Sequence, residues 1–338
     1  MKKKWLIFSI AFLGCFVLCC FLLIRINSKK QIQRSYLCIE GAYFEPVKIT
    51  NFSSRIPCVD ISIGGKAIAA KVDLGFNGDI SLPRECIAEL DDKSFFHRAS
   101  HFGIRGKKYY SDIYKIPEIK IGRMVFFRAK AQEINLEFEE DATILKDEQS
   151  PSIGHLGRIG WRLFHNFNCF IDCDNSLIAF CDSTNTLREK GYPVDAFIET
   201  SLLLDRNSVE FEATTETGLM RCILDTGSTG SMFNKDMQEG FNHMIYNPST
   251  IDQHEPLNPL NIDQMQFDME DICNVSIFKI GGKDFGPVRF QKMKSPLEIE
   301  AIIGMDFLES KLVFIDFPNR KIYFYQKPLT DDSNTKQS

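Results

Sequence analysis

The chain carries one ordered set of motifs twice, and this duplication limits what it can fold into. The first copy ends in Ile159-Gly160-Trp161 and a later Asp-x-x-Asn turn, and the second repeats both features. Matched residues lie 144 positions apart: Gly160 and Gly304, Asp172 and Asp316, Asn175 and Asn319, Phe180 and Phe324. Such self-similarity at a fixed offset is the signature of repeated structural units. We therefore expect two homologous lobes.

The segments between these motifs are typical of β-strands. Short apolar and β-branched runs at 58–63, 67–72 and 116–121 lie between turn residues such as Gly64-Gly65 and Gly122. Few segments favour helix; we expect short helices after Pro83, at 84–90, and at 235–239. The sequence predicts a mainly β protein.

Each copy also places one aspartate after an apolar strand and before a glycine turn. The first is Asp73 in Val72-Asp73-Leu74-Gly75, and the second is Asp225 in Leu224-Asp225-Thr226-Gly227. Two carboxylates about 3 Å apart cannot both ionise, so they hold one proton between them. The ionised one can then take a proton from water while the other donates to a carbonyl.

Together with the downstream Ile302-Ile303-Gly304 and Arg158-Ile159-Gly160 segments, these motifs resemble those of aspartic proteases of the pepsin and retropepsin type. The spacing is similar to two retropepsin-like units fused in one chain. The resemblance implies two acid-protease-like β-barrel lobes with a cleft between them, and Asp73 and Asp225 as the catalytic pair. It also implies a monomeric catalytic unit that binds polypeptide in an extended conformation and needs no cofactor.

The resemblance further implies which residues support the pair. Gly75 and Gly227 let the backbone turn tightly, Thr226 donates a hydrogen bond to the other lobe, and Ser228 supports the carboxylate. The first copy departs from this pattern.

Leu74 has no hydroxyl, and Phe76 stands where the second copy has Ser228, although Asn77 offers a substitute. Two hypotheses therefore stay open: an aspartic endopeptidase, or a catalytically degenerate scaffold that binds peptides or a protein partner.

The family covers its cleft with a β-hairpin flap. The stretch from His101 to Tyr110 follows Asp73 at a suitable distance and contains glycines, so the candidate flap residues are Gly103, Ile104, Arg105 and Gly106. The matching stretch of the second copy, 251–260, contains two prolines and favours a hairpin less.

The N-terminus predicts a membrane anchor. Three lysines precede residues 5–24, which carry no charge and have the length that a bilayer-spanning helix needs. A cleaved signal peptide has a shorter apolar stretch; it remains the alternative. We expect a single-pass membrane protein with a cytoplasmic N-terminus and the catalytic region on the exported side, periplasmic or extracellular/lumenal.

The chain thus divides into five expected segments. They are a basic N-terminus and anchor (1–30), a linker (31–50), a first lobe (51–185), a second lobe (186–328) and a disordered tail (329–338).

Composition narrows the function further. The net charge is −5, and no basic run is interleaved with aromatic residues, which argues against a nucleic-acid partner. The 6 histidines share no metal-ligand spacing, so we expect no metal site. The 11 cysteines form no CxxC pair, and both disulfides and buried thiols stay possible.

Overall fold

The computed structural model describes residues 35–37, 43–53, 55–102, 108–134, 157–234, 272–293 and 299–327. The expected anchor (5–24), the candidate flap residues, the helix at 235–239 and the tail lie outside these ranges. Within them, no helix is both long and apolar enough to cross a bilayer.

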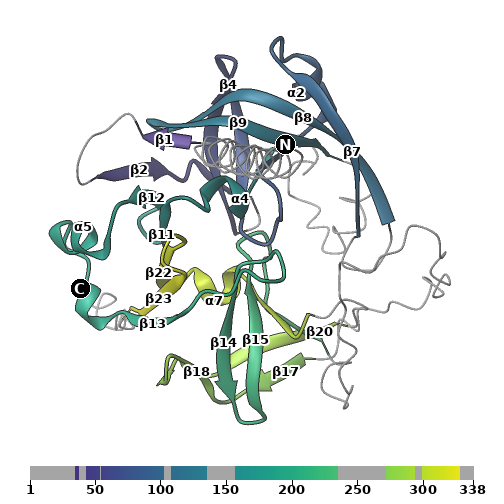
Figure 1. Ribbon diagram of the computed structural model, residues 1–338. Helices are drawn as coiled ribbons and strands as arrows, with labels where there is room; N and C mark the ends of the chain where they lie inside the picture. The colour runs from purple at the N-terminus through teal and green to yellow at the C-terminus, as the bar shows by residue number, and fades with distance from the viewer. Residues whose placement is uncertain are drawn as a thin grey trace, which may run out of the picture.

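Three β-sheets organise the described part of the chain (Figure 1). The prediction of a mainly β, two-lobed fold is confirmed. Most of the first half forms a nine-stranded sheet that contains β1 (Ser35–Leu37), β3 (Asn51–Ser53), β4 (Ile56–Ile63), β5 (Lys66–Asp73), β6 (Ile80–Leu82), β7 (Ser94–Phe102), β8 (Lys108–Ile121), β9 (Met124–Glu133) and β10 (Gly157–Gly160). The long strands β8 and β9 also pair with each other, which curls this sheet toward a barrel.

Most of the second half repeats this topology. Its sheet contains β14 (Glu210–Thr215), β15 (Gly218–Leu224), β16 (Met232–Asn234), β17 (Ile272–Val275), β18 (Phe278–Ile280), β19 (Lys283–Asp284), β20 (Val288–Met293) and β21 (Ala301–Ile303). In the first lobe β10 lies parallel to β5 and antiparallel to β6. In the second lobe β21 lies parallel to β15 and antiparallel to β16. The motif duplication is therefore also a duplication of strand order.

A six-stranded sheet joins the two halves. It contains β2 (Phe44–Lys48), β11 (Asn168–Asp172), β12 (Leu177–Cys181), β13 (Ile198–Ser201), β22 (Lys311–Asp316) and β23 (Lys321–Gln326). At its centre β11 pairs antiparallel with β22, and Phe170 lies opposite Phe314. The segment that we expect to be a linker, 31–50, contributes β2, which pairs with β12 at the edge of this sheet.

The few helices of the described chain are short. They are α2 (Arg84–Ala88), α4 (Trp161–Phe164), α5 (Thr184–Glu189), the 3₁₀ turn η2 (Val194–Ala196) and α7 (Met305–Leu308). α2 confirms the helix expected after Pro83. α4 and α7 each begin directly after the glycine of an apolar-Gly segment, Gly160 and Gly304.

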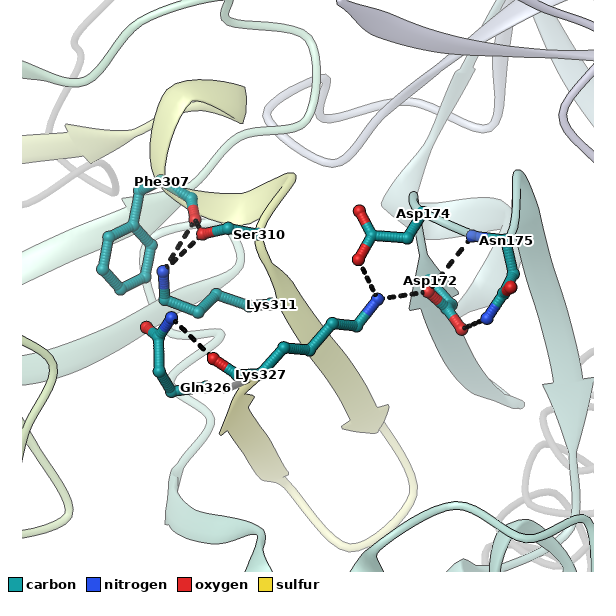
Figure 2. A network of polar contacts seen from close by, with 8 residues as sticks. All are labelled: Asp172, Asp174, Asn175, Phe307, Ser310, Lys311, Gln326 and Lys327. Atoms are coloured by element: carbon teal, nitrogen blue, oxygen red, sulfur yellow. Dashed lines mark hydrogen bonds and ion pairs between the residues drawn. The ribbon is translucent and has the colours of Figure 1, made fainter. Parts of the chain in front are cut away.

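The duplicated Asp-x-x-Asn turns close hairpins in the six-stranded sheet. The side chain of Asn175 donates to Asp172 at 2.6 Å, and that of Asn319 donates to Asp316 at 2.9 Å. These contacts close the two Asp-x-x-Asn turns that the sequence pattern predicts. Figure 2 shows that Lys327, which follows β23, reaches across to Asp172 and Asp174 at 2.7 and 2.6 Å. The end of the second half is thus tied to the hairpin of the first.

Among the described cysteines, Cys86, Cys169, Cys173, Cys181 and Cys222 are free thiols. Four of these five are buried, and burial raises the pKa of Cys169 to about 12. They behave as small apolar residues.

Phe314 provides a test of the joining sheet. It is fully buried and packs in a cluster with Phe170, so Phe314→Ala should lower the free energy of unfolding by about 3–5 kcal/mol. Denaturant titration measures this. Phe95, which is 61% exposed, supplies the control: Phe95→Ala should cost far less, and equal losses would contradict the packing described.

Candidate active site

The two motif aspartates end matching strands. Asp73 is the last residue of β5, and Asp225 directly follows β15. The preceding residues, Val72 and Leu224, are buried. Because side chains alternate along a strand, the two carboxylates lie on the opposite face, away from those buried neighbours. Each strand is anchored by the parallel strand that carries its apolar-Gly segment.

The two motifs approach each other so closely that each glycine contacts the other aspartate. A Cβ atom added to Gly75 would lie 2.4 Å from Cγ of Asp225, and one added to Gly227 would lie 2.3 Å from Cγ of Asp73. Any side chain at either position would displace the opposing carboxyl group. The glycines are thus required by close approach across the lobe interface, and the two carboxyl groups are brought together.

Thr226 fastens this arrangement from one side. Its buried hydroxyl donates to the carbonyl oxygen of Val72 at 2.7 Å and accepts the backbone N–H of Leu74 at 3.0 Å. Leu74 occupies the matching place in the first lobe and is fully buried, but it has no hydroxyl with which to return the bonds. The resemblance implies hydrogen bonds between the lobes at this level, which we call the brace. Only the second lobe makes them, through Thr226.

Backbone amides hold the two carboxylates. Oδ1 of Asp73 accepts the N–H of Phe76 at 2.9 Å, and Oδ1 of Asp225 accepts the N–H of Gly227 at 2.8 Å. The expectation for the Ser228 side chain needs correction, because its hydroxyl donates instead to the carbonyl of Gly230 at 2.7 Å. The turn after each aspartate directs an amide at the carboxylate, so no side-chain donor is needed there.

Asn77, the proposed substitute in the first lobe, has another partner: its side-chain oxygen accepts from Arg162 at 2.5 Å. In the second lobe, Asp306 lies exposed in α7 and accepts both the N–H and the hydroxyl of Ser231, at 3.0 and 2.7 Å. Both contacts tie the loop that follows an aspartate to the helix behind it.

Gly160 and Gly304 lie directly beneath these loops. A Cβ at Gly160 would come 2.3 Å from the carbonyl oxygen of Gly78, and one at Gly304 would come 2.4 Å from that of Gly230. The apolar-Gly segments therefore pack against the aspartate loops as the duplicated motif requires.

Asp73 and Asp225 have different electrostatic surroundings. Burial and then the nearby charge of Asp73 raise the pKa of Asp225 well above its ordinary range, while the N–H of Gly227 opposes that rise. A hydrogen bond between the two carboxyl groups also raises the pKa of Asp225. Asp73 instead faces a cation, because Nε of Arg158 lies 3.5 Å from its Oδ2. The surroundings of Asp225 thus favour its protonated form, while a guanidinium lies beside Asp73.

Sequence reasoning did not assign Arg158 to the site. The available signal was a charged residue in Arg158-Ile159-Gly160 where the matched segment, Ile302-Ile303-Gly304, is apolar. Assigning it requires the strand register, in which Arg158 lies opposite Lys71, two residues before Asp73.

Two paired strands of the first lobe flank the candidate flap residues. β7 and β8 pair antiparallel up to Phe102 opposite Lys108. The four candidate residues, Gly103, Ile104, Arg105 and Gly106, belong to the connection between these strands and lie outside the described residues.

No metal centre is formed by the described ranges: no group of three or more His, Cys, Asp or Glu side chains is placed as ligands would be.

Comparisons with known proteins agree with this fold. No protein-family model matches the chain, and neither does any curated protein sequence. Among solved structures, the chain is similar to Basic 7S globulin from soybean, with a TM-score of 0.50 and 12% sequence identity over 86% of this chain and 96% of that chain. At this identity the likeness shows the fold alone. It supports a pepsin-like, two-lobed β arrangement at a coarse level.

The two hydrogen bonds of Thr226 predict that Thr226→Val lowers the free energy of unfolding markedly. Thr226→Val keeps the shape but leaves the buried Val72 carbonyl and Leu74 amide without their partner, at roughly 1–3 kcal/mol for each group. Thr226→Ser keeps the hydroxyl and should retain most of the stability. Denaturant unfolding of both variants measures this, and a loss in Thr226→Ser as large as that in Thr226→Val would contradict the dominant role of the two hydrogen bonds.

The raised pKa of Asp225 predicts a pH dependence of stability. The folded protein keeps this proton at pH values at which the unfolded chain has released it, so the carboxyl group lowers stability as pH rises above about 3.9. Asp225→Asn cannot ionise, and the variant should therefore lose less stability between pH 4 and pH 7 than the parent. Unfolding curves across this range measure the difference. The exposed Asp91 supplies the control, because Asp91→Asn should follow the parent; a parallel curve for Asp225→Asn would count against the described environment.

Proposed function

We propose that the protein is an aspartic endopeptidase in which Asp73 and Asp225 activate water to hydrolyse a peptide bond. One observation carries the proposal: the reciprocal contact in which each motif glycine lies against the other motif's carboxyl group. This contact supports the proposal because it places carboxyl groups from the two lobes close to each other.

The geometry supports a division of roles. Asp73, paired with Arg158, is the charged member and takes a proton from the bound water as the hydroxide oxygen attacks the peptide carbonyl carbon. Asp225 holds the shared proton and donates it to the carbonyl oxygen. The resulting tetrahedral diol collapses when Asp73 passes its proton to the leaving nitrogen, while Asp225 recovers a proton from one diol hydroxyl. No covalent enzyme intermediate forms, and both carboxyl groups return to their starting states.

The amides of Phe76 and Gly227 contribute by orientation. Each donates to Oδ1 of its aspartate, which fixes the rotation of the carboxyl group toward the partner. Thr226 sets the distance between the lobes at the same level. Such preorganisation lowers the barrier because the groups need not move during reaction.

A second function is favoured by a specific observation. Leu74 cannot complete the brace, and the guanidinium of Arg158 lies beside the carboxylate that has to accept the proton from water. Both features fit a peptide-binding scaffold that has lost catalysis.

Proteolysis of an unfolded protein by the full-length chain, measured from pH 3 to pH 7, separates the two functions. An endopeptidase should cleave it, and Asp73→Asn and Asp225→Asn should each lower the rate by at least about 100-fold. Asp91→Asn, at an exposed site, should not.

Leu74→Thr tests the scaffold directly, because it supplies the missing hydroxyl. An inactive parent whose Leu74→Thr variant gains activity would establish the scaffold reading. Activity that survives in Asp225→Asn would refute the proposed mechanism.

A further inference from the structure

The edge of the nine-stranded sheet carries exposed aromatic side chains. β7 is the last strand of this sheet and, among the described strands, pairs with β8 alone. Its pairing is irregular between Phe95 and His97, where a bulge interrupts the register. Phe95 and Phe96 are both exposed, by 61% and 40%. Single exposed apolar residues are ordinary, whereas neighbouring ones bordered by polar groups mark an interaction surface.

Two lysines border these phenylalanines. Lys115 of β8 lies opposite Lys130 of β9, and their amino groups lie 4.6 and 5.1 Å from the centre of the Phe96 ring. Neither lysine has a carboxylate partner among the described residues. Like charges directly opposite on paired strands destabilise a sheet, so an anion at this place would relieve their repulsion. We call Phe95, Phe96, Lys115 and Lys130 the edge patch.

The strands around the edge patch are basic, although the whole chain has a net charge of −5. Residues 94–133, which contain β7, β8 and β9, include 9 Lys or Arg and 3 Asp or Glu. With the turn that precedes β7, residues 91–133 still include 10 Lys or Arg and 5 Asp or Glu. Each acidic side chain of 94–133 has a cation within ion-pair distance: Asp112 has Arg98, Glu118 has Lys120, and Glu133 has Arg84. Such charge asymmetry within a chain favours an anionic partner.

The start of β1 brings the N-terminal part of the chain to these strands. Ser35 lies opposite Phe126 of β9, and Lys130 lies further along the same strand by about 13 Å. Residues 25–34 separate Ser35 from the uncharged stretch 5–24, and ten residues can span at most about 35 Å. A bilayer that holds the expected anchor therefore lies within reach of the edge patch. Residues 1–34 also carry 7 Lys or Arg and no Asp or Glu.

An anionic lipid surface fits these features together. Phenyl rings can enter the boundary between headgroups and acyl chains, while lysines keep their amino groups among the phosphates. Basic residues next to a membrane anchor are attracted to anionic lipids. A second copy of this chain fits less well, because it would bring the same positive charge into the contact.

We propose that the edge patch docks on an anionic lipid surface, with Phe95 and Phe96 inserted between headgroups and with Lys115 and Lys130 at the lipid phosphates. The inference goes beyond the proposed function, because it assigns a binding surface that includes neither motif aspartate. In Figure 1, β8 and β9 lie at the opposite end of the molecule from β17 and β18. Docking through the edge patch therefore leaves this part of the second lobe away from the lipid.

The test reconstitutes the full-length protein into vesicles of phosphatidylcholine, either alone or in an equal mixture with anionic phosphatidylglycerol. A trace lipid with a photoreactive diazirine in its acyl chain labels the residues that it contacts, and mass spectrometry locates the adducts. The β7 segment that contains Phe95 and Phe96 should carry adducts, about 10-fold more with the anionic lipid than without it. The segment around Leu219, which is exposed in the second lobe, should carry none in either mixture.

Variants separate charge from insertion. Lys115→Gln combined with Lys130→Gln should remove most of the rise that the anionic lipid causes, whereas Lys115→Arg combined with Lys130→Arg should keep it. Phe95→Asp combined with Phe96→Asp should remove the adducts throughout β7 in both mixtures. Leu219→Asp, the matched control at an exposed apolar residue, should leave them unchanged. Circular dichroism checks that each variant is folded.

The result does not depend on peptidase activity, so it stands apart from the proposed function. A β7 segment without adducts in the anionic vesicles overturns the proposal, whether or not the 5–24 stretch is labelled. Equal labelling in the two lipid mixtures also overturns it. If β7 is unlabelled but becomes protected from hydrogen exchange as the concentration of detergent-solubilised protein rises, the edge patch contacts a second copy instead of lipid.

Discussion

The contact between the two aspartate loops is the constraint on which the rest of the structure depends. The Thr226 hydroxyl bonds the backbone of the other lobe on both sides of Asp73, and Gly75 and Gly227 leave room for the opposing carboxyl groups. The six-stranded sheet holds the lobes in place on a larger scale. Without that support, two carboxyl groups would separate, since their mutual repulsion and desolvation oppose close approach.

The two lobes share their strand order but differ in the side chains beside their aspartates. The strand order and the packing of Gly160 and Gly304 beneath the loops are shared by both lobes. The side chains beside the aspartates are not shared. The second lobe contributes the brace and apolar neighbours, and the first contributes Leu74 and the cations Lys71 and Arg158. This division gives the two aspartates different surroundings.

Sequence alone predicted the parts of the fold that are local or repeated. The duplicated motifs, the strand character, the helix after Pro83 and the Asp172 and Asp316 turns all follow from short-range patterns, and the structure agrees with each. The pairing of β2 with β12 could not be predicted in this way, because its partners lie more than 120 positions apart and share no motif. The contacts of Ser228 and Arg158 were missed for related reasons: backbone amide direction and strand register are set by the folded chain.

A titration of the Asp225 carboxyl carbon by ¹³C NMR, in the parent and in Asp73→Asn, tests the central claim most directly. If the two carboxyl groups meet, Asp225 should stay protonated well above the ordinary range of aspartate. Removing the charge of Asp73 should then lower its pKa, although burial keeps it raised. Titration of Asp225 in the ordinary range, unaffected by Asp73→Asn, would contradict the account.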